Sequence, residues 1–159
     1  MAVRFHLNNP VQLSAQRLFD LMIEPKAQEA FNMSKGALES RCTRSEAGGL
    51  IKLEIYIKEP SHEAKNKPPD EGTMLMNYDP KTLSCTWERR DHKHGKLVKV
   101  TGRIEIRAAG DNRCILDEQG EIAIKIPILG NRIAKKAAKQ LEENHPQTCR
   151  QWEQLAETL

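Results

Sequence analysis

Two charged residues fall where an alternating strand pattern points side chains inward. Glu118 shares the phase of Leu116 and Ile122 in the last strand-like segment, and Arg89 continues the phase of Trp87. Burying a carboxylate is costly unless the group is paired or neutralised, so an inward Glu118 needs a reason. Ligand binding, proton transfer as a general acid or base, and a structural pair with Arg89 would each supply one. A register shift or a bulge would instead place Glu118 in water.

A second group of reactive side chains lies in the segment 91–96. Asp91, His92 and His94 could approach a metal ion from one side, but no third strong ligand is close in the sequence. We therefore interpret this segment as a solvated turn and predict no metal site and no cofactor. The chain also shows no Ser-His-Asp arrangement, no phosphate-binding glycine-rich loop and no cysteine with an identifiable base. These absences favour a binding protein over an enzyme.

The elements that must position these residues follow from hydrophobic periodicity. Alternation of apolar and polar residues predicts a first strand around 3–7. Two short helices follow, the first capped by Ser14 and the second beginning at Pro25. From Leu38 onward the apolar period is two, which predicts six further strands with one face toward water.

The connections between these strands differ in length and composition. In an antiparallel meander successive turns alternate between the two ends of the sheet, so three tight turns share one end and three longer connections share the other. Long loops gathered at one end resemble the rim of an opening. The expected tight turns are 46–49, 79–82 and 109–112, and the expected rim segments are 60–72, 91–96 and 127–130.

The chain closes with a long helix pattern directly after the last strand. An apolar stripe at i, i+3 and i+4 spacing runs from Ile133 to Leu159 and predicts a helix over 131–159. The stripe keeps its phase through Pro146, so we expect a kink and not a break. A sheet with one dry face needs a cover, and this helix supplies it. We therefore predict an α+β domain spanning 1–159, with a seven-stranded antiparallel curved sheet wrapped around the C-terminal helix.

Composition limits the classes of function. The chain has 25 basic and 22 acidic residues, interleaved and without a long basic run, and only seven aromatics. We therefore expect no nucleic-acid partner. No segment approaches the roughly 20 apolar residues of a membrane span, so stable membrane insertion is not expected. Four cysteines without a CxxC pair read as reduced core residues, which together with the missing signal peptide predicts a cytoplasmic protein. These cysteines are Cys42, Cys85, Cys114 and Cys149.

The order of one strand, two helices, six strands and one long helix, with the segment 126–130 leading into that helix, resembles the START-like superfamily. This is the helix-grip group that includes polyketide cyclases and lipid-transfer domains. More narrowly, the chain looks like a bacterial family of unknown function within the superfamily. The resemblance implies a sheet gripping the helix around an apolar cavity. It also implies binding of lipids, sterols, polyketides or other apolar molecules, with catalysis in some members, but it supplies no universal catalytic motif.

The leading hypothesis is binding or transport of a small hydrophobic or amphipathic ligand, lipid-like or polyketide-like, between the sheet and the final helix. One alternative is a cyclase, dehydratase or hydrolase that uses Glu118 as an acid or base. Another is a protein-interaction module without a cavity, marked by an exposed apolar patch around Ile128 and Leu129. The expected ligand-binding residues are Ile51, Leu53, Ile55, Met76, Tyr78, Trp87, Arg89, Val100, Glu118, Ile122, Ala137 and Leu141.

Overall fold

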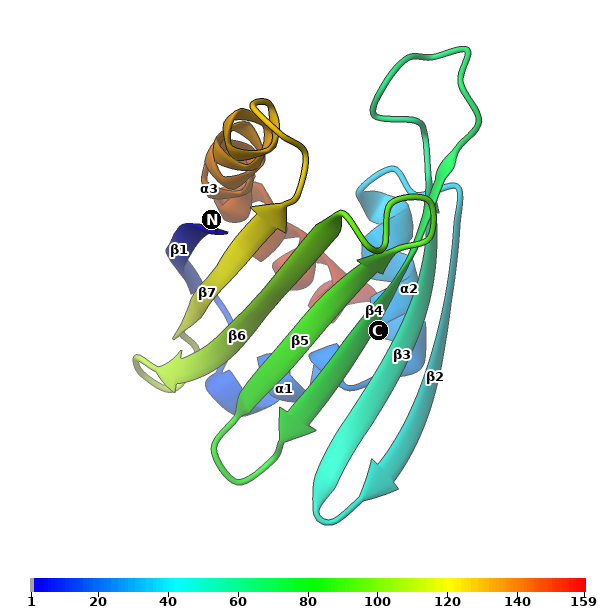
Figure 1. Ribbon diagram of the computed structural model, residues 1–159. Coiled ribbons are helices and arrows are strands. Elements are labelled where there is room, and N and C mark those ends of the chain that lie inside the picture. Colours follow the sequence, from blue (N-terminus) through cyan, green and yellow to red (C-terminus); the bar gives the residue numbers. More distant parts are fainter. Residues whose placement is uncertain (1) are drawn as a thin grey trace.

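The computed structural model describes residues 2–159. The strands are β1 (Ala2–Val11), β2 (Glu39–Ala47), β3 (Leu50–Glu59), β4 (Asp70–Asp79), β5 (Ser84–Asp91), β6 (Val98–Ala108) and β7 (Cys114–Ile124), and the helices are α1 (Ala15–Met22), α2 (Pro25–Ser34) and α3 (Gly130–Thr158). All strand pairs are antiparallel, in the spatial order β1-β7-β6-β5-β4-β3-β2 (Figure 1). The expected α+β architecture, a seven-stranded sheet around a C-terminal helix, is confirmed.

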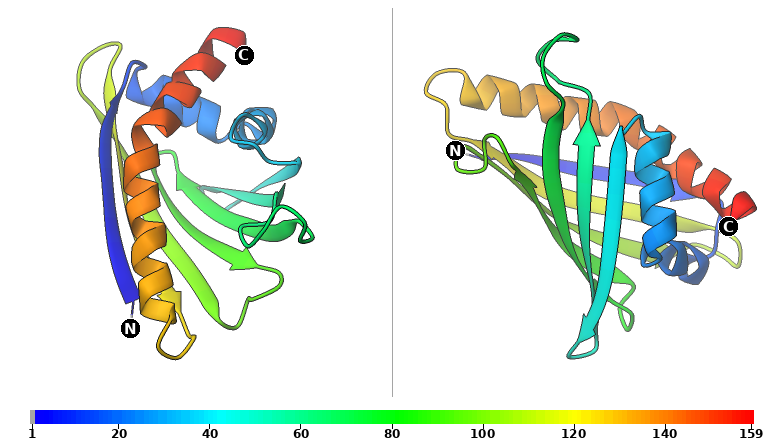
Figure 2. Two further views of the ribbon diagram at one scale, coloured as in Figure 1. Left: turned by 90° about the horizontal axis from the view of Figure 1, so that it is seen from above. Right: turned by 90° about the vertical axis from the view of Figure 1, so that its right-hand side faces the viewer.

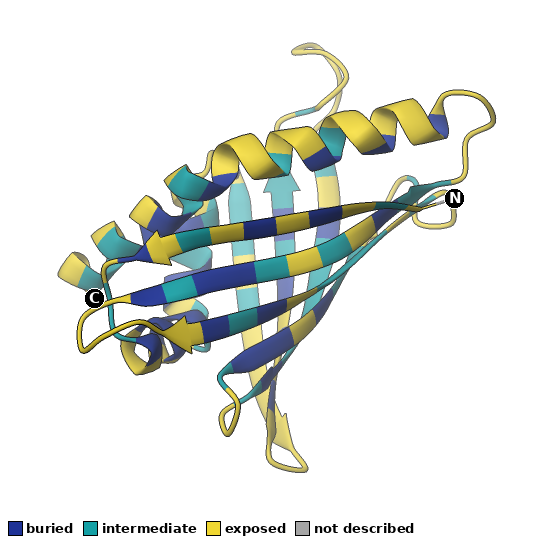
Figure 3. Cartoon of the chain, turned by 90° about the vertical axis from the view of Figure 1, so that its left-hand side faces the viewer, coloured by how far each residue is buried: buried dark blue, intermediate teal, exposed yellow. Residues whose placement is uncertain are grey.

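Strand β3 illustrates why the sheet has one dry face. Its apolar residues at alternate positions from Ile51 to Ile57 are buried, whereas Lys52 and Glu54 are exposed. Successive side chains of a strand point to opposite faces, so the alternation in the sequence becomes an alternation in burial. Figure 3 shows the same banding along several strands.

The three helices lie on the concave side of the sheet (Figure 2). The first begins as expected, because the hydroxyl oxygen of Ser14 accepts a hydrogen bond from the backbone N–H of Arg17 at 3.1 Å. The second has Pro25 in its first turn, where the missing N–H costs nothing. Together α1 and α2 cover part of the concave face and leave the rest to α3.

Helix α3 is continuous over 29 residues, with Pro146 inside it. It changes direction between its orange and red parts (Figure 2), as expected for a proline that removes one helical hydrogen bond. Near its C-terminal end the ring of Trp152 stacks on Phe31 of α2, with ring centroids 4.3 Å apart. The predicted core stripe is wrong at its ends, since Ile133 and Leu159 are 45% and 56% exposed. Ile133 is on the outer side of the helix, next to the buried Ala134, and Leu159 follows the last residue of the helix.

A row of two aromatics and two glycines crosses the sheet from β1 to β5. Phe5 is opposite Gly120, Gly120 is opposite Gly102, and Gly102 is opposite Trp87. The two rings meet over the glycines, with centroids 6.4 Å apart. A Cβ on Gly102 would lie 2.5 Å from the indole, so only glycine lets the ring lie this close to the strand. The row places the Trp87 indole on the concave face.

Candidate functional site

The concave face of the sheet and helices α2 and α3 enclose a cavity of about 620 Å³. This volume lies within the range of typical small-molecule sites. Its wall is mostly apolar, with polar side chains supplied by both helices and by several strands. The apolar wall residues are Leu7, Met22, Phe31, Ala37, Ile55, Ile57, Pro60, Met74, Met76, Trp87, Val100, Ile104, Leu116, Leu141 and Trp152, and the others are Gln28, Asn32, Lys35, Gly36, Glu59, Ser61, His62, Arg89, Glu118, Asn144, His145 and Thr148.

Glu118 lines this cavity from β7. Desolvation raises the pKa of its carboxyl group from 4.5 to about 7, while the nearby Lys35 ammonium and Trp87 indole N–H act in the opposite direction. The indole nitrogen is itself buried and falls short of hydrogen-bond geometry with any described residue. Glu118 is therefore a carboxyl group that can hold or release a proton near neutral pH.

Arg89 does not pair with Glu118, although their inward phases made such a pair one explanation for a buried carboxylate. Its Nη2 instead lies 2.9 Å from Oε1 of Glu59, at the end of β3. Strand position does not explain the choice, because β3 and β7 are each two strands from β5 and both carboxylates lie four residues from the cross-strand row of Arg89. Within residues 2–159, the carboxyl group of Glu118 is left without a guanidinium partner.

Lys35, just after α2, supplies the cation that the strand pattern did not indicate. Its Nζ donates to the hydroxyl oxygen of Thr148 at 3.1 Å and lies 5.2 Å from the centroid of the Phe31 ring. Desolvation by the surrounding protein lowers the pKa of its ammonium group, and Glu118 and Glu59 oppose this only in part. No carboxylate of the described chain comes within ion-pair distance of Lys35.

His145 lies on the face of α3 that meets the cavity and is buried. Its Nδ1 is 2.7 Å from the amide oxygen of Asn9 on β1. Burial, together with the charge of Lys35, lowers the pKa of the ring from 6.5 to about 4. The histidine is therefore neutral at neutral pH, with Nε2 making no hydrogen bond to a described residue.

Seven of the twelve predicted ligand-binding residues line the cavity. These are Ile55, Met76, Trp87, Arg89, Val100, Glu118 and Leu141. The other five do not line the cavity: four are buried core residues of the strands, and one is a partly buried residue of α3. Those five are Ile51, Leu53, Tyr78, Ile122 and Ala137.

Tyr78 shows why a residue on the inward face of a strand need not line the cavity. Its side chain points inward as expected, but α1 covers that part of β4, and the Phe19 ring meets it edge-on with centroids 5.8 Å apart. The hydroxyl oxygen accepts from Gln28 Nε2 at 3.3 Å. Period-two alternation identifies the face of a strand but does not show which part of that face a helix will fill.

Of the twenty cavity residues that sequence reasoning missed, eight lie in helices, and the polar ones among them and next to them were the hardest to predict. Lys35, Asn144, His145 and Thr148 are polar and stand at or near helix ends or kinks, so an apolar stripe does not select them. His145 carried a usable signal, because it is four residues from both Leu141 and Cys149 on the apolar stripe.

The expected rim agrees with the structure in one of its three segments. Residues 60–62 line the cavity, but no residue of 91–96 or 127–130 does. The opening is marked by exposed wall residues at the end of α2, after β3 and in the middle of α3, such as Lys35, His62 and Asn144. The rim prediction assigned the connections to the correct ends of the sheet. However, the segment 127–130 only leads into α3, which begins at Gly130 and reaches the cavity farther along, from Leu141 onward.

The segment 91–96 is a hydrogen-bonded turn. The carboxylate of Asp91 accepts from the backbone N–H of His94 at 2.6 Å, and His92 Nε2 is 2.8 Å from the hydroxyl oxygen of Thr73. Within residues 2–159, no group of three or more His, Cys, Asp or Glu side chains is arranged to hold a metal ion. Likewise, no helix of the described chain is both long and apolar enough to cross a membrane.

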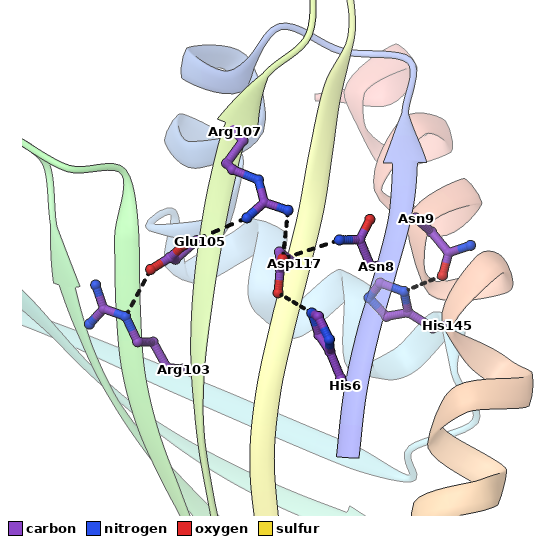
Figure 4. A network of polar contacts seen from close by, with 8 residues as sticks. All are labelled: His6, Asn8, Asn9, Arg103, Glu105, Arg107, Asp117 and His145. Carbon is purple, nitrogen blue, oxygen red and sulfur yellow. Dashed lines mark hydrogen bonds and ion pairs between the residues drawn. The ribbon is translucent and has the colours of Figure 1, made fainter. Parts of the chain in front are cut away.

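A separate polar network covers the convex face (Figure 4). Asp117 is only 3% exposed there, although its position in β7 alternates with the inward Glu118. Its carboxylate accepts from Asn8 Nδ2 at 3.1 Å and from Arg107 Nη2 at 2.6 Å, and it lies 2.9 Å from His6 Nε2. Side chains of β1 and β6 thus bury this carboxylate and satisfy it outside the cavity.

Solved structures share this fold over nearly the whole chain. A protein from Thermus thermophilus superposes with a TM-score of 0.72 at 13% identity, covering 98% of both chains. The Zhui aromatase/cyclase from a Streptomyces species gives 0.66 at 11% identity, covering 99% of this chain and 94% of that one. A START superfamily protein from Mycobacterium smegmatis gives 0.61 at 18% identity, covering 96% and 98%. At such identities the likeness concerns the fold.

Sequence comparison adds one match. Residues 80–153 match the model of a family described as a protein of unknown function, DUF2505. The matched segment runs from the β4–β5 turn into α3 and includes both Glu118 and His145. No curated protein matches the chain. The chain therefore has the START-like, helix-grip fold that its element order predicted, and about its second half resembles a family of unknown function.

Proposed function

We propose that this protein binds a small amphipathic molecule, with its apolar body in the cavity and its polar group at Lys35. The observation that carries the proposal is a cavity of about 620 Å³ with a mostly apolar wall and one cation without a carboxylate partner among the described residues. Apolar walls supply affinity by desolvation, and a few convergent polar groups fix orientation. A lipid-like or polyketide-like ligand and a cytoplasmic location belong to this proposal.

The polar groups at Lys35 favour a ligand with a hydrogen-bond acceptor or a negative charge. Lys35 offers N–H donors and Thr148 a hydroxyl group, and both reach the same place. Protonated Glu118 would donate as well, whereas Arg89 is occupied by Glu59. A carboxylate, a sulfonate or a phenolic oxygen on an apolar body would satisfy this set of groups.

Two fluorescent probes of similar size test the proposal directly. Anilinonaphthalene sulfonate is apolar and anionic, and phenylnaphthylamine is apolar and uncharged. We expect both to bind, and we expect Lys35→Met to weaken the anionic probe about ten-fold while leaving the uncharged probe within about two-fold. Lys52→Met, on the convex face, is the matched control and should change neither affinity.

A cavity-filling substitution separates cavity binding from surface binding. Val100→Phe would place a larger side chain in the cavity and should weaken both probes. Val98→Phe, on the same phase of β6 but outside the cavity wall, should weaken neither. Equal affinity of the Val100→Phe variant and the parent protein would exclude the cavity as the binding site. As a separate experiment, native mass spectrometry of protein purified from its own host would identify any retained molecule.

A second function, proton-transfer catalysis, is favoured by one observation. Glu118 has a pKa of about 7, lies in a cavity and is not neutralised by Arg89. A carboxyl group of this kind can act as a general acid or base near neutral pH. If the molecule recovered by native mass spectrometry is turned over, Glu118→Gln should abolish turnover while probe binding persists. Turnover that survives this substitution would remove Glu118 from the reaction.

A further inference from the structure

Large apolar side chains are exposed together where β7 passes into α3, at the end of the sheet seen at the top of Figure 1. Ile128 is 97% exposed, Leu129 53% and Ile133 45%. Leu97 joins them, because its carbonyl oxygen accepts from the backbone N–H of Lys125 at 2.7 Å. Five of the nine exposed large apolar residues of the described chain lie here. We call this cluster the apolar tip: Leu97, Ile126, Ile128, Leu129 and Ile133.

The backbone holds the tip in place. The N–H of Gly130 donates to the carbonyl oxygen of Ile126 at 2.9 Å, and a Cβ on Gly130 would lie 2.2 Å from the carbonyl oxygen of Ile124. Ile128 itself has a φ of +70°, a conformation that suits glycine or asparagine and strains a β-branched residue. Neither side-chain burial nor backbone preference therefore explains why position 128 is an isoleucine.

The stretch of chain that carries most of the tip is basic. From Ile122 to Leu141 the sequence has five basic residues and no acidic one. All five are exposed, and within residues 2–159 none is in an ion pair. The five are Lys125, Arg132, Lys135, Lys136 and Lys139.

We propose that the apolar tip and these cations dock the protein on the surface of an anionic lipid bilayer. Apolar side chains of a peripheral protein enter the boundary between headgroups and acyl chains, and each basic residue near an anionic surface adds roughly five-fold to binding. A bilayer accepts a projecting apolar side chain such as Ile128 without a matching groove. A protein partner would need such a groove and fixed acidic positions. The contact is peripheral and does not depend on what the cavity holds.

Sedimentation with lipid vesicles tests this docking. The protein should pellet with phosphatidylcholine vesicles that contain phosphatidylglycerol and should remain in solution with phosphatidylcholine alone. Ile128→Asn should weaken binding about ten-fold, since it removes the most exposed apolar group. Asparagine tolerates a positive φ, so this variant should be at least as stable as the parent in urea unfolding. Leu50→Asn, in the hairpin at the opposite end of the sheet, should bind like the parent.

Charge reversal tests the second half of the proposal. Lys135→Glu should weaken vesicle binding several-fold, whereas Lys81→Glu, at the opposite end of the sheet, changes the net charge equally and should have little effect. Equal effects of the two reversals, or full binding by Ile128→Asn, would overturn the proposal. So would vesicle-independent dimerisation that Ile128→Asn abolishes in sedimentation equilibrium, because the tip would then be an interface between copies of this chain.

Discussion

The imidazole Nδ1 of His145 and the amide oxygen of Asn9 lie 2.7 Å apart, joining the middle of α3 to β1 (Figure 4). An amide oxygen only accepts hydrogen bonds, so Nδ1 of the neutral ring carries the proton and Nε2 keeps its lone pair. His145 also lines the cavity. Because this hydrogen bond fixes the tautomer, a ligand in the cavity would encounter Nε2 as a hydrogen-bond acceptor.

Removing the Asn9 side-chain amide should therefore change both the stability of the protein and the tautomer of His145. Asn9→Ala leaves the buried Nδ1–H without its acceptor, which should lower the free energy of unfolding by about 1–3 kcal/mol in urea titrations. In the parent protein, nitrogen NMR of the imidazole should show one dominant tautomer, protonated at Nδ1. The variant should show a mixture. Equal tautomer populations in the parent would contradict the assignment.

Glu118 should make folding stability fall as pH rises. Its pKa is about 7 in the folded protein and 4.5 ordinarily. Between these values the unfolded chain loses its proton first, so stability decreases by up to about 3 kcal/mol and is fully recovered only below pH 4.5. Glu118→Gln removes this loss. The variant should exceed the parent in stability above about pH 7 and equal it below about pH 4.5, as measured by urea unfolding.

His145 acts with the opposite sign over nearly the same range. Its pKa is about 4 in the folded protein and 6.5 ordinarily, so the unfolded chain binds the proton first as pH falls. This effect makes stability rise with pH between those values. In the parent the two effects largely cancel, and Glu118→Gln should uncover the rise due to His145. Glu121→Gln, exposed on the other face of β7, should keep the pH profile of the parent.

The strand faces could be predicted from the sequence because side-chain alternation is a local property. It put Glu118 inward and identified the dry face of β3 correctly. Lys35 and His145 could not be placed in the same way, because they reach the cavity through helix packing between segments more than 100 residues apart. Asp117 was also beyond local reasoning, since its burial depends on side chains from β1 and β6.

The buried carboxylate of Asp117 should make Arg107 the important cation of the convex network. Arg107→Met leaves Asp117 with fewer compensating charges and should cost about 1–2 kcal/mol of unfolding free energy, a range reduced because Arg107 is half exposed. Arg103→Met is the control, since its ion pair is with the exposed Glu105, and it should stay within about 0.5 kcal/mol of the parent. Adding Asp117→Leu to the Arg107 variant should recover part of the loss. If the losses of unfolding free energy from the Arg107 and Asp117 substitutions were additive, the two side chains would not be directly coupled.

Alanine substitutions of Gly120 and Gly102, the two glycines between Phe5 and Trp87, should have different effects. A Cβ on Gly120 would lie 2.3 Å from the carbonyl oxygen of Thr101 and 2.4 Å from the ring of Phe5, so strand backbone must move to admit it. A Cβ on Gly102 first meets the indole of Trp87, a side chain that can shift. We expect Gly120→Ala to lose more unfolding free energy than Gly102→Ala, with losses of about 1–3 kcal/mol. Gly102→Ala should instead displace the indole, shifting its fluorescence and altering probe affinity in the cavity. Equal losses of stability, with no change in fluorescence in either variant, would show that Gly102 does not determine the position of the Trp87 indole.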